Sequence, residues 1–286
     1  MNSMLTINRK FVKKLFPARP AWSHKGQAGK LLVIGGSLRY SGSPAFAALA
    51  AIRTGADLTL VAAPRRAADI IARFQPDLIT EPLCRDYLCP ADVKPLLKLA
   101  KWADALVIGG GLDRKENTYR TIRLLLKQLE PNKPCVLDAE ALRAVAGTVH
   151  TRLLKKSFVL TPHENEFQAL GGGEPSHATK ERVIQVKRLA AKLKSTILLK
   201  GHVDVISDGR QVALNRTGNP YMTKGGTGDT LAGICGALLA RGVSAFEAAS
   251  AAVWINGAAG DWALKSLGPG FFVSEMLDFI PKAVWK

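Results

Sequence analysis

Short continuous apolar runs, separated by helical patterns, constrain the fold of this chain more than any other feature. The runs occupy residues 30–36, 57–63, 105–111, 135–141, 158–164 and 196–202. Runs that are continuous rather than alternating are typical of strands covered on both faces. Helical patterns lie between them at 43–55, 118–130 and 177–194. This rhythm predicts an α/β fold with a mostly parallel central sheet and helices on both faces.

The segment after Lys200 departs from this rhythm. Residues 203–209 and 211–215 are predicted to form a hairpin closed by Asp208 and Gly209, and three helices are expected after it. Neither a Pro/Ser-rich linker nor an internal repeat interrupts the 286 residues. We therefore expect one domain over 1–286.

The charge indicates an anionic ligand. Lys and Arg number 40 against 23 Asp and Glu, which gives a net charge of +17. Such a surface attracts anions in general. A non-enzymatic anion-binding or nucleic-acid-binding protein is one interpretation of it. The chain lacks zinc-finger spacing and has only 7% aromatic residues, so nucleic acid is not the expected partner. The basic stretch 177–194, which includes Arg182, is interpreted as a solvated helix face.

Other features favour a cytoplasmic protein that does not enter a membrane. The basic N-terminal segment has no apolar stretch of signal-peptide type, and no later segment is apolar over ~18 residues. The cysteines have no second pair at metal-ligand spacing, so they are interpreted as reduced intracellular thiols. They are Cys84, Cys89, Cys135 and Cys235.

Glycine and polar residues follow the ends of the predicted strands. They are Gly35 to Ser37, Gly109 to Gly111, Asp138 and Glu140, His163 to Glu166, and Lys200 with Gly201. Open parallel sheets bind ligands in the crevice outside the carboxyl ends of their strands. The sequence therefore predicts one elongated site at this edge.

The segment TKGGTGDT, residues 223–230, adds a candidate phosphate site. Glycines allow close backbone approach, and a helix start offers unpaired N–H groups to an anion. Asp229 beside a phosphate makes sense where it takes a proton or holds a metal. The alternative is an ordinary turn in which Thr227 or Asp229 caps the helix. Neither the P-loop pattern nor G-x-G-x-x-G after a strand is present.

Residues 225–233, GGTGDTLAG, resemble the anion hole and catalytic base of the ribokinase-like superfamily. The further motifs LTPHENEF (160–167), VLDAEAL and LLKGHVDVI occur in the order seen in ADP- or ATP-dependent NAD(P)H-hydrate dehydratases. This resemblance runs from about Lys25 to Ile280. It implies phosphorylation of the hydrate's hydroxyl, then phosphate elimination that restores NAD(P)H.

The resemblance also implies roles for individual residues. Asp229 is expected to be the general base, and Gly225, Gly226, Thr227 and Gly228 to donate backbone N–H groups to the phosphoryl group. The S-epimer hydrate is expected to contact Ser43, Gly111, Asp138, His163 and Asp229. The donor ADP or ATP is expected to contact Lys200, Gly201, His202, Val203, Asp204 and Gly228. Mg²⁺ is expected at Glu166 through water, with Asn165 beside it.

The sequence departs from the family pattern at six positions. They are Ser43, Gly110, Asp113, Glu140, Asp204 and Asn256. The first four and Asn256 affect the fit of the dinucleotide, and Asp204 affects the adenosine contacts. The epimerase domain that often precedes this one is expected to be absent. Family members commonly assemble, so a homo-oligomer such as a tetramer is expected.

Two rival functions differ in their use of these residues. A ribokinase-like kinase of a vitamin precursor, such as a hydroxyethylthiazole or pyrimidine alcohol, would use the same loop and Asp229 but release a stable phosphorylated product. An anion-binding protein would not need Asp229. For either enzyme, a side chain at Gly226 or Gly228 is expected to impair phosphate transfer more than folding. ADP is the expected donor by analogy with the family.

Overall fold

The computed structural model describes residues 5–147 and 149–285, which are organised around one sheet. Its ten strands lie in the order β1-β10-β9-β8-β7-β6-β5-β2-β3-β4. Strand β9 runs antiparallel to β8 and β10, and the other neighbours pair in parallel. The strands are β1 (Leu5–Thr6), β2 (Lys30–Ile34), β3 (Leu58–Pro64), β4 (Ile79–Leu83), β5 (Ala105–Ile108), β6 (Cys135–Leu137), β7 (Phe158–Leu160), β8 (Thr196–Leu199), β9 (Asp204–Ser207) and β10 (Val212–Asn215).

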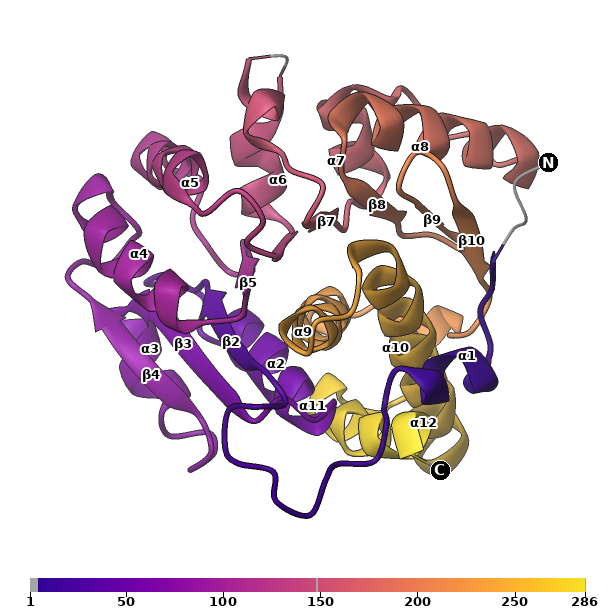
Figure 1. Ribbon diagram of the computed structural model, residues 1–286, viewed down its shortest axis with the longest axis horizontal. Helices are drawn as coiled ribbons and strands as arrows, with labels where there is room; N and C mark the ends of the chain where they lie inside the picture. The colour runs from indigo at the N-terminus through magenta and orange to yellow at the C-terminus, as the bar shows by residue number, and fades with distance from the viewer. Residues whose placement is uncertain (1–4, 148, 286) are drawn as a thin grey trace.

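Helices cover both faces of this sheet. In Figure 1 the sheet curves around α9 and α10, while α4, α5, α6 and α8 lie on its outer side. The α-helices are α1 (Arg9–Lys14), α2 (Gly42–Arg53), α3 (Arg65–Ile71), α4 (Val93–Trp102), α5 (Glu116–Gln128), α6 (Glu140–Val145), α7 (Glu164–Phe167), α8 (Thr179–Leu193), α9 (Thr227–Ala240), α10 (Ala245–Leu267), α11 (Val273–Met276) and α12 (Ile280–Trp285).

The apolar strands supply two separate cores, one on each face. Along β2, Leu31 and Val33 join the core that includes α2, α9 and α10, whereas Leu32 and Ile34 join the core that includes α4, α5 and α8. Successive strand residues point to opposite faces, so a strand buried on both faces has no polar alternation. The continuous runs in the sequence follow from this arrangement.

Small residues let α9 lie close to its neighbours. A Cβ at Gly233 would lie 2.0 Å from the Ala47 carbonyl oxygen, and one at Gly236 would lie 2.4 Å from Val107 Cγ2. Helix α9 therefore rests directly on α2 and β5, which fixes the position of its first turn.

We expect Gly233→Ala to destabilise the protein strongly. The added methyl group meets backbone atoms of α2, and overpacking of this kind costs about 1–3 kcal/mol or more. Gly270→Ala is the matched control because nothing lies within 4 Å of the added Cβ, and we expect a change within about 0.5 kcal/mol there. Urea unfolding of both variants measures the difference. Equal stability of the two would contradict the close packing of α9.

The prediction of an α/β fold with a mostly parallel sheet is confirmed in its main elements, and three details differ. The six predicted strands and the 203–215 hairpin are present, but the edge strands β4 and β1 were not predicted. Strand β4 is largely exposed and contains Pro82, so it lacks the apolar pattern of a covered strand. The prediction of three helices after the hairpin is wrong, because α9 and α10 are followed by two short helices, α11 and α12. Across residues 5–147 and 149–285, no helix has the length and apolar character needed to cross a bilayer.

Candidate active site

Three neighbouring cavities lie outside the carboxyl ends of the strands. The central cavity, about 350 Å³, is lined by Asp138, Glu166, Lys200 and Asp229 among others. It shares Ser43, Gly111 and Arg114 with a second cavity of about 630 Å³, which we call the Tyr40 cavity. It shares His163, Lys200 and Gly228 with a third of about 610 Å³, the Asn256 cavity. The three cavities thus adjoin one another along the sheet edge where the elongated site is predicted, and we call them together the groove.

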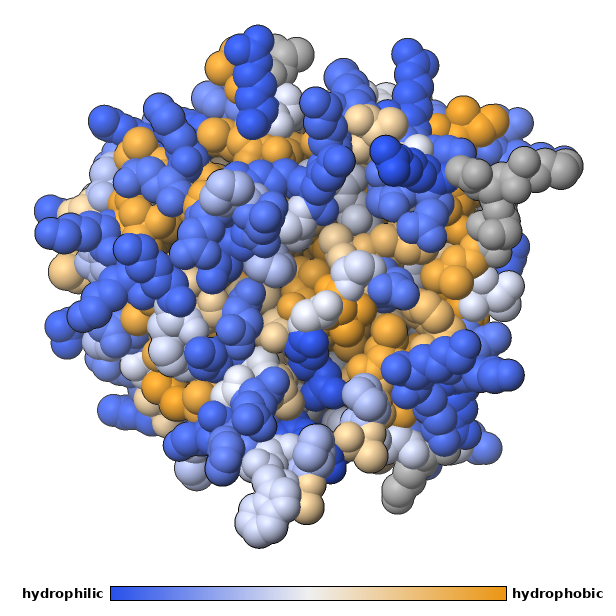
Figure 2. Space-filling view, viewed as in Figure 1, coloured by the Kyte–Doolittle hydropathy of each residue, from blue (hydrophilic) through white to orange (hydrophobic). Residues whose placement is uncertain are grey.

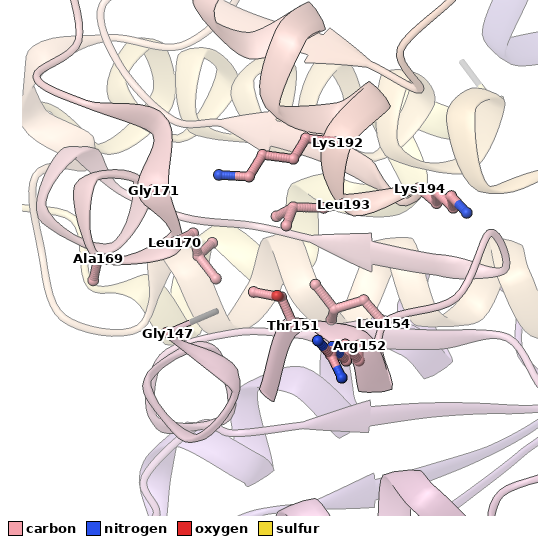
Figure 3. A pocket seen from close by; sticks show the side chains of 10 residues that line it. All are labelled: Gly147, Thr151, Arg152, Leu154, Ala169, Leu170, Gly171, Lys192, Leu193 and Lys194. Atoms are coloured by element: carbon pink, nitrogen blue, oxygen red, sulfur yellow. The ribbon is translucent and has the colours of Figure 1, made fainter. Parts of the chain in front are cut away.

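The surface of the molecule and a cavity apart from the groove are shown in two further views. Figure 2 shows hydrophilic residues spread around the rim of one face and hydrophobic residues gathered near its middle, over α9 and α10. A separate cavity of about 710 Å³ is lined by residues of 147–154, 169–171 and 192–194. Figure 3 shows that its basic side chains do not converge, since Lys194 points away from Lys192. None of the predicted site residues lines it.

The start of α9 presents free backbone donors to the central cavity. Gly226 is the N-cap with φ of 108°, a left-handed conformation that glycine adopts without strain. Among the described residues, the N–H groups of Gly225, Gly226 and Gly228 find no backbone acceptor, whereas the Thr227 N–H lies 3.4 Å from the Lys224 carbonyl oxygen. The first turn of α9 is thus arranged to receive an anion.

Side chains hold this turn in place without filling it. Thr227 Oγ1 lies 2.9 Å from the carbonyl oxygens of Met222 and Lys224. Asn256, from α10, accepts from Thr230 Oγ1 at 2.7 Å and donates to the Thr227 carbonyl at 3.2 Å. Asn256, noted in the sequence only as a departure, therefore positions the phosphate loop.

The two central glycines of the loop differ in what they tolerate. A Cβ at Gly228 would face Lys200 Nζ at 3.7 Å, in the cavity, so the space there is open to a ligand. A Cβ at Gly226 would lie 2.9 Å from Phe46 on a backbone with positive φ. The expectation that both positions affect transfer more than folding is therefore corrected for Gly226, where a side chain also strains the fold.

We expect Gly228→Val to lower turnover about 10²-fold, because the side chain blocks an anion's approach to the N–H donors. Thermal stability should stay close to that of Gly270→Val, whose added Cβ meets nothing within 4 Å. Gly226→Val should lower the melting temperature instead. Initial rates and thermal unfolding measure both effects. A fall in stability of Gly228→Val in step with its activity would favour the ordinary-turn interpretation.

The carboxyl group of Asp229, the predicted general base, is buried beside the central cavity. Burial raises its pKa to about 7, and the charge of Asp138 adds to this rise, while a hydrogen bond from Ser43 and the charge of Lys200 oppose it. A Cβ at position 110 would lie 2.6 Å from Asp229 Oδ1, so Gly110 leaves room for the carboxyl group. The departures at Ser43 and Gly110 thus lie against Asp229 itself.

Lys200 is the cation at the middle of the acidic cluster. Its ammonium donates to Asp138 Oδ1 at 3.1 Å, and Thr161 Oγ1 donates to the same oxygen at 2.7 Å. Burial lowers the pKa of Lys200, but the charges of Asp138, Glu166 and Asp229 outweigh burial and raise it overall. Lys200 therefore remains protonated and balances three carboxyl groups.

His163 and Glu166 form the capping box of α7. His163 Nδ1 accepts from the Asn165 and Glu166 N–H groups at 3.2 and 3.4 Å, and Glu166 Oε2 accepts from the His163 N–H at 2.9 Å. Burial and the Lys200 charge lower the pKa of His163, so its ring is neutral. Burial raises the pKa of Glu166. Glu166 faces the central cavity, whereas Asn165 is exposed and lines none of the three cavities.

The loop after β8 lines the Asn256 cavity through its backbone and through Asp204. Asp204 accepts from the Gly201 N–H at 3.0 Å and from Asn215 Nδ2 at 2.9 Å, and burial raises its pKa to about 6. Both carboxylate oxygens hold the loop rather than standing free for a nucleoside. Gly201 and His202 line the cavity as well, but Val203 does not.

The contacts of Glu140 and the backbone conformation of Ala139 were not predicted from the sequence. Glu140 is buried and accepts from Arg114 Nε at 3.0 Å and from the Tyr119 hydroxyl at 2.8 Å, with Arg143 Nε at 3.5 Å. Ala139, just before it, has φ of 45°, a strained conformation for a residue with a side chain. Such strain concentrates at functional sites. Here the strained residue lies between Asp138 and Glu140, where the chain turns.

The α/β fold, with a glycine-rich loop at the start of α9, is that of a ribokinase-like protein. A ribokinase-like superfamily protein from Enterococcus faecalis superposes with a TM-score of 0.83 at 26% identity, over 98% of this chain and 95% of the other. The chain belongs to the NAD(P)H-hydrate dehydratase family, whose model matches residues 31–282. An ADP/ATP-dependent NAD(P)H-hydrate dehydratase from Bacillus subtilis, co-crystallized with ATP/Mg²⁺, superposes with a TM-score of 0.80 at 28% identity and 96% coverage of both chains.

Curated relatives are named as NAD(P)H-hydrate repair enzymes or dehydratases. A bifunctional NAD(P)H-hydrate repair enzyme of Pyrobaculum aerophilum is 42% identical over 93% of this chain and 52% of its own length. The chain thus spans about half the length of that relative. An ADP-dependent (S)-NAD(P)H-hydrate dehydratase of Cenarchaeum symbiosum is 38% identical over 96% of this chain and 94% of its own.

Proposed function

We propose that this protein dehydrates the S epimer of NADH or NADPH hydrate, using ADP or ATP as phosphoryl donor, and so restores the reduced cofactor. Family membership supports this proposal, and the arrangement of Asp229 beside the donor-rich start of α9 carries it. The kinase alternative has weaker support. A hydroxyethylthiazole kinase from Pyrococcus horikoshii, at 19% identity and a TM-score of 0.64, shares the fold alone.

In the first step, the hydroxyl oxygen of the hydrate attacks the terminal phosphorus of the donor nucleotide. Asp229 takes the hydroxyl proton, and the nucleotide leaves one phosphate shorter. The N–H groups of Gly225, Gly226 and Gly228 stabilise the charge of the moving phosphoryl group. The Lys200 ammonium is placed between the phosphate loop and the acidic cluster, so it balances charge on both sides of the reaction centre.

In the second step, the new phosphate ester is eliminated. The C6–oxygen bond breaks, inorganic phosphate leaves, and the adjacent ring carbon loses a proton to re-form the double bond. Phosphate is a far better leaving group than hydroxide. A phosphoryl-transfer site therefore serves a dehydration.

The residues present suit Mg²⁺ bound mostly through water and phosphate. Within the described residues, no group of three or more His, Cys, Asp or Glu side chains forms a ready-made metal cage. Mg²⁺ keeps several waters and joins proteins through one or two carboxylates, and Glu166 lines the central cavity where it can accept from such waters. When bound, the ion neutralises charge on the donor phosphates. Asn165 is placed less well for this role because it is exposed.

Purified protein, Mg²⁺ and either ADP or ATP, added to the S-epimer hydrate of NADH or NADPH, test the function. We expect the near-ultraviolet absorbance of the dihydronicotinamide to return and inorganic phosphate to appear in equal amount. Parallel reactions with the two nucleotides decide the donor. Nucleotide consumption with a stable phosphorylated product would favour a kinase, and no absorbance recovery with either donor would refute the dehydratase.

The setting of this reaction is part of the proposal. We expect it to take place in the cytoplasm, where the nicotinamide cofactors and free thiols such as Cys84 coexist. We also propose assembly into a homo-oligomer. Light scattering with size-exclusion chromatography measures the oligomeric state.

A further inference from the structure

We infer that the Tyr40 cavity binds the adenosine half of the dinucleotide, with Arg39 as the receptor for a 2′-phosphate. The protein should therefore prefer NADPH hydrate to NADH hydrate. This inference rests on the proposed function, because it specifies which of the two dinucleotide hydrates the proposed dehydratase prefers.

Within the groove, the Tyr40 cavity is the part that remains for the adenosine half of the acceptor dinucleotide. The Asn256 cavity is lined by the loop after β8 and the start of α9, which the proposed function assigns to the phosphoryl donor. The reacting hydroxyl must lie beside Asp229 in the central cavity. The rest of the dinucleotide then extends past Ser43 and Gly111 into the Tyr40 cavity. Its volume of about 630 Å³ is that of a small-ligand site.

Three hydrogen bonds to its backbone groups fix the turn 37–40, which lines this cavity. The Ser37 N–H donates to the Tyr40 carbonyl at 2.9 Å, and the Leu38 N–H donates to the Asp86 carbonyl at 3.0 Å. Arg66 Nη1 donates to the Leu38 carbonyl at 2.5 Å. A turn held at these points presents its side chains in one arrangement before any ligand arrives, which reduces the entropy lost on binding.

The exposed side chains of this turn suit an adenosine. Leu38 is 52% exposed and Tyr40 is 51% exposed, and both line the cavity. Large apolar side chains left open beside a pocket commonly mark a binding surface. An aromatic ring and an aliphatic side chain offer flat apolar contact to a purine base.

Arg39 supplies a cation that the protein itself does not neutralise. It is exposed in the same cavity, and no acidic group in 5–147 or 149–285 forms an ion pair with it. The acids nearby are already engaged. Asp113 accepts from Thr118 Oγ1 at 2.5 Å and lies 3.4 Å from Lys115 Nζ, while Glu140 holds Arg114. A guanidinium binds phosphate oxygens through two parallel hydrogen bonds, and arginine serves the 2′-phosphate in other dinucleotide sites.

The ratio of kcat/KM for NADPH hydrate over NADH hydrate tests the inference. We expect a ratio of about 10 or more for the unmodified protein, the effect of one hydrogen-bonded charge pair. Arg39→Gln should bring the ratio close to one, and Arg39→Lys should give an intermediate value, because lysine keeps the charge but not the planar fork. Arg188→Gln, which removes an exposed arginine of α8 outside the groove, should leave the ratio unchanged.

A binding measurement separates this inference from the proposed function. Calorimetric titration with NADP⁺ and NAD⁺, with a non-hydrolysable ATP analogue filling the donor site, needs no turnover. Tighter binding of NADP⁺ that Arg39→Gln abolishes would support the 2′-phosphate site even if neither hydrate were dehydrated. Equal binding of the two dinucleotides, or an unchanged ratio in Arg39→Gln, would overturn it. Loss of dehydration with the binding preference intact would refute only the proposed function.

Discussion

Asp229→Asn should lower kcat about 10³-fold and leave nucleotide binding intact. The amide keeps the shape of the side chain but cannot take the hydroxyl proton. Single-turnover phosphate release measures the chemical step, and calorimetric titration with ADP measures binding. Asp69→Asn, an exposed change on α3, is the matched control and should retain activity. An Asp229→Asn enzyme with most of its activity would exclude Asp229 as the base.

The raised pKa of Asp229 sets the direction of the pH effects. The carboxyl group is protonated in the folded protein up to about pH 7 but ionises near pH 4 in the unfolded chain. Activity should therefore rise through about pH 7 as the base form appears. The contribution of this group to stability should fall as the pH rises from about 4 to about 7. Asp229→Asn should remove that fall and raise the melting temperature at pH 8, as expected of a charge held for function.

Lys200→Met should lower kcat about 10²-fold or more and move the acid limb of the pH–rate profile upward. Lys200 is the cation that lies among Asp138, Glu166 and Asp229, and its charge lowers the pKa of Asp229. Without it, Asp229 ionises only at higher pH, so less of the base form exists at neutral pH.

The pH–rate profile of kcat/KM between pH 5.5 and 9 checks this prediction, with Lys192→Met on α8 as the matched control. Thermal unfolding at pH 6 and 8 shows whether the variant is folded. A lower kcat with an unmoved acid limb would mean that Lys200 acts through the nucleotide and not through Asp229.

The local features of the site were predictable because each depends on neighbouring residues in the chain. Glycines before an apolar helical pattern indicate a helix start open to an anion, and α9 begins at Thr227 as this predicts. A strand that ends in polar residues places them at one edge of a parallel sheet. Asp138 and Lys200, which follow β6 and β8, accordingly line one cavity. The start of α9 adds Asp229 to the same cavity.

The sequence did not reveal contacts between residues far apart in the chain. Arg182 was interpreted as part of a solvated face, but it is 6% exposed and donates to Glu164 Oε1 at 2.7 Å and to the Lys200 carbonyl at 3.0 Å. A helical sequence pattern shows which face of the helix is apolar. It does not show which basic side chain beside that face will contact a loop from another part of the chain. The same holds for Asn256, whose contact with Thr230 joins two helices.

Local sequence patterns predicted the covered strands of the sheet and the glycine-rich start of α9, because burial on both faces and glycine conformation leave such patterns. The environment of Asp229 depends instead on the tertiary structure. Its pKa depends on burial, Asp138, Ser43 and Lys200, and its space depends on Gly110. These residues come from five separate segments. Their mutual distances arise only when the sheet edge brings the segments together, and electrostatic effects depend on those distances.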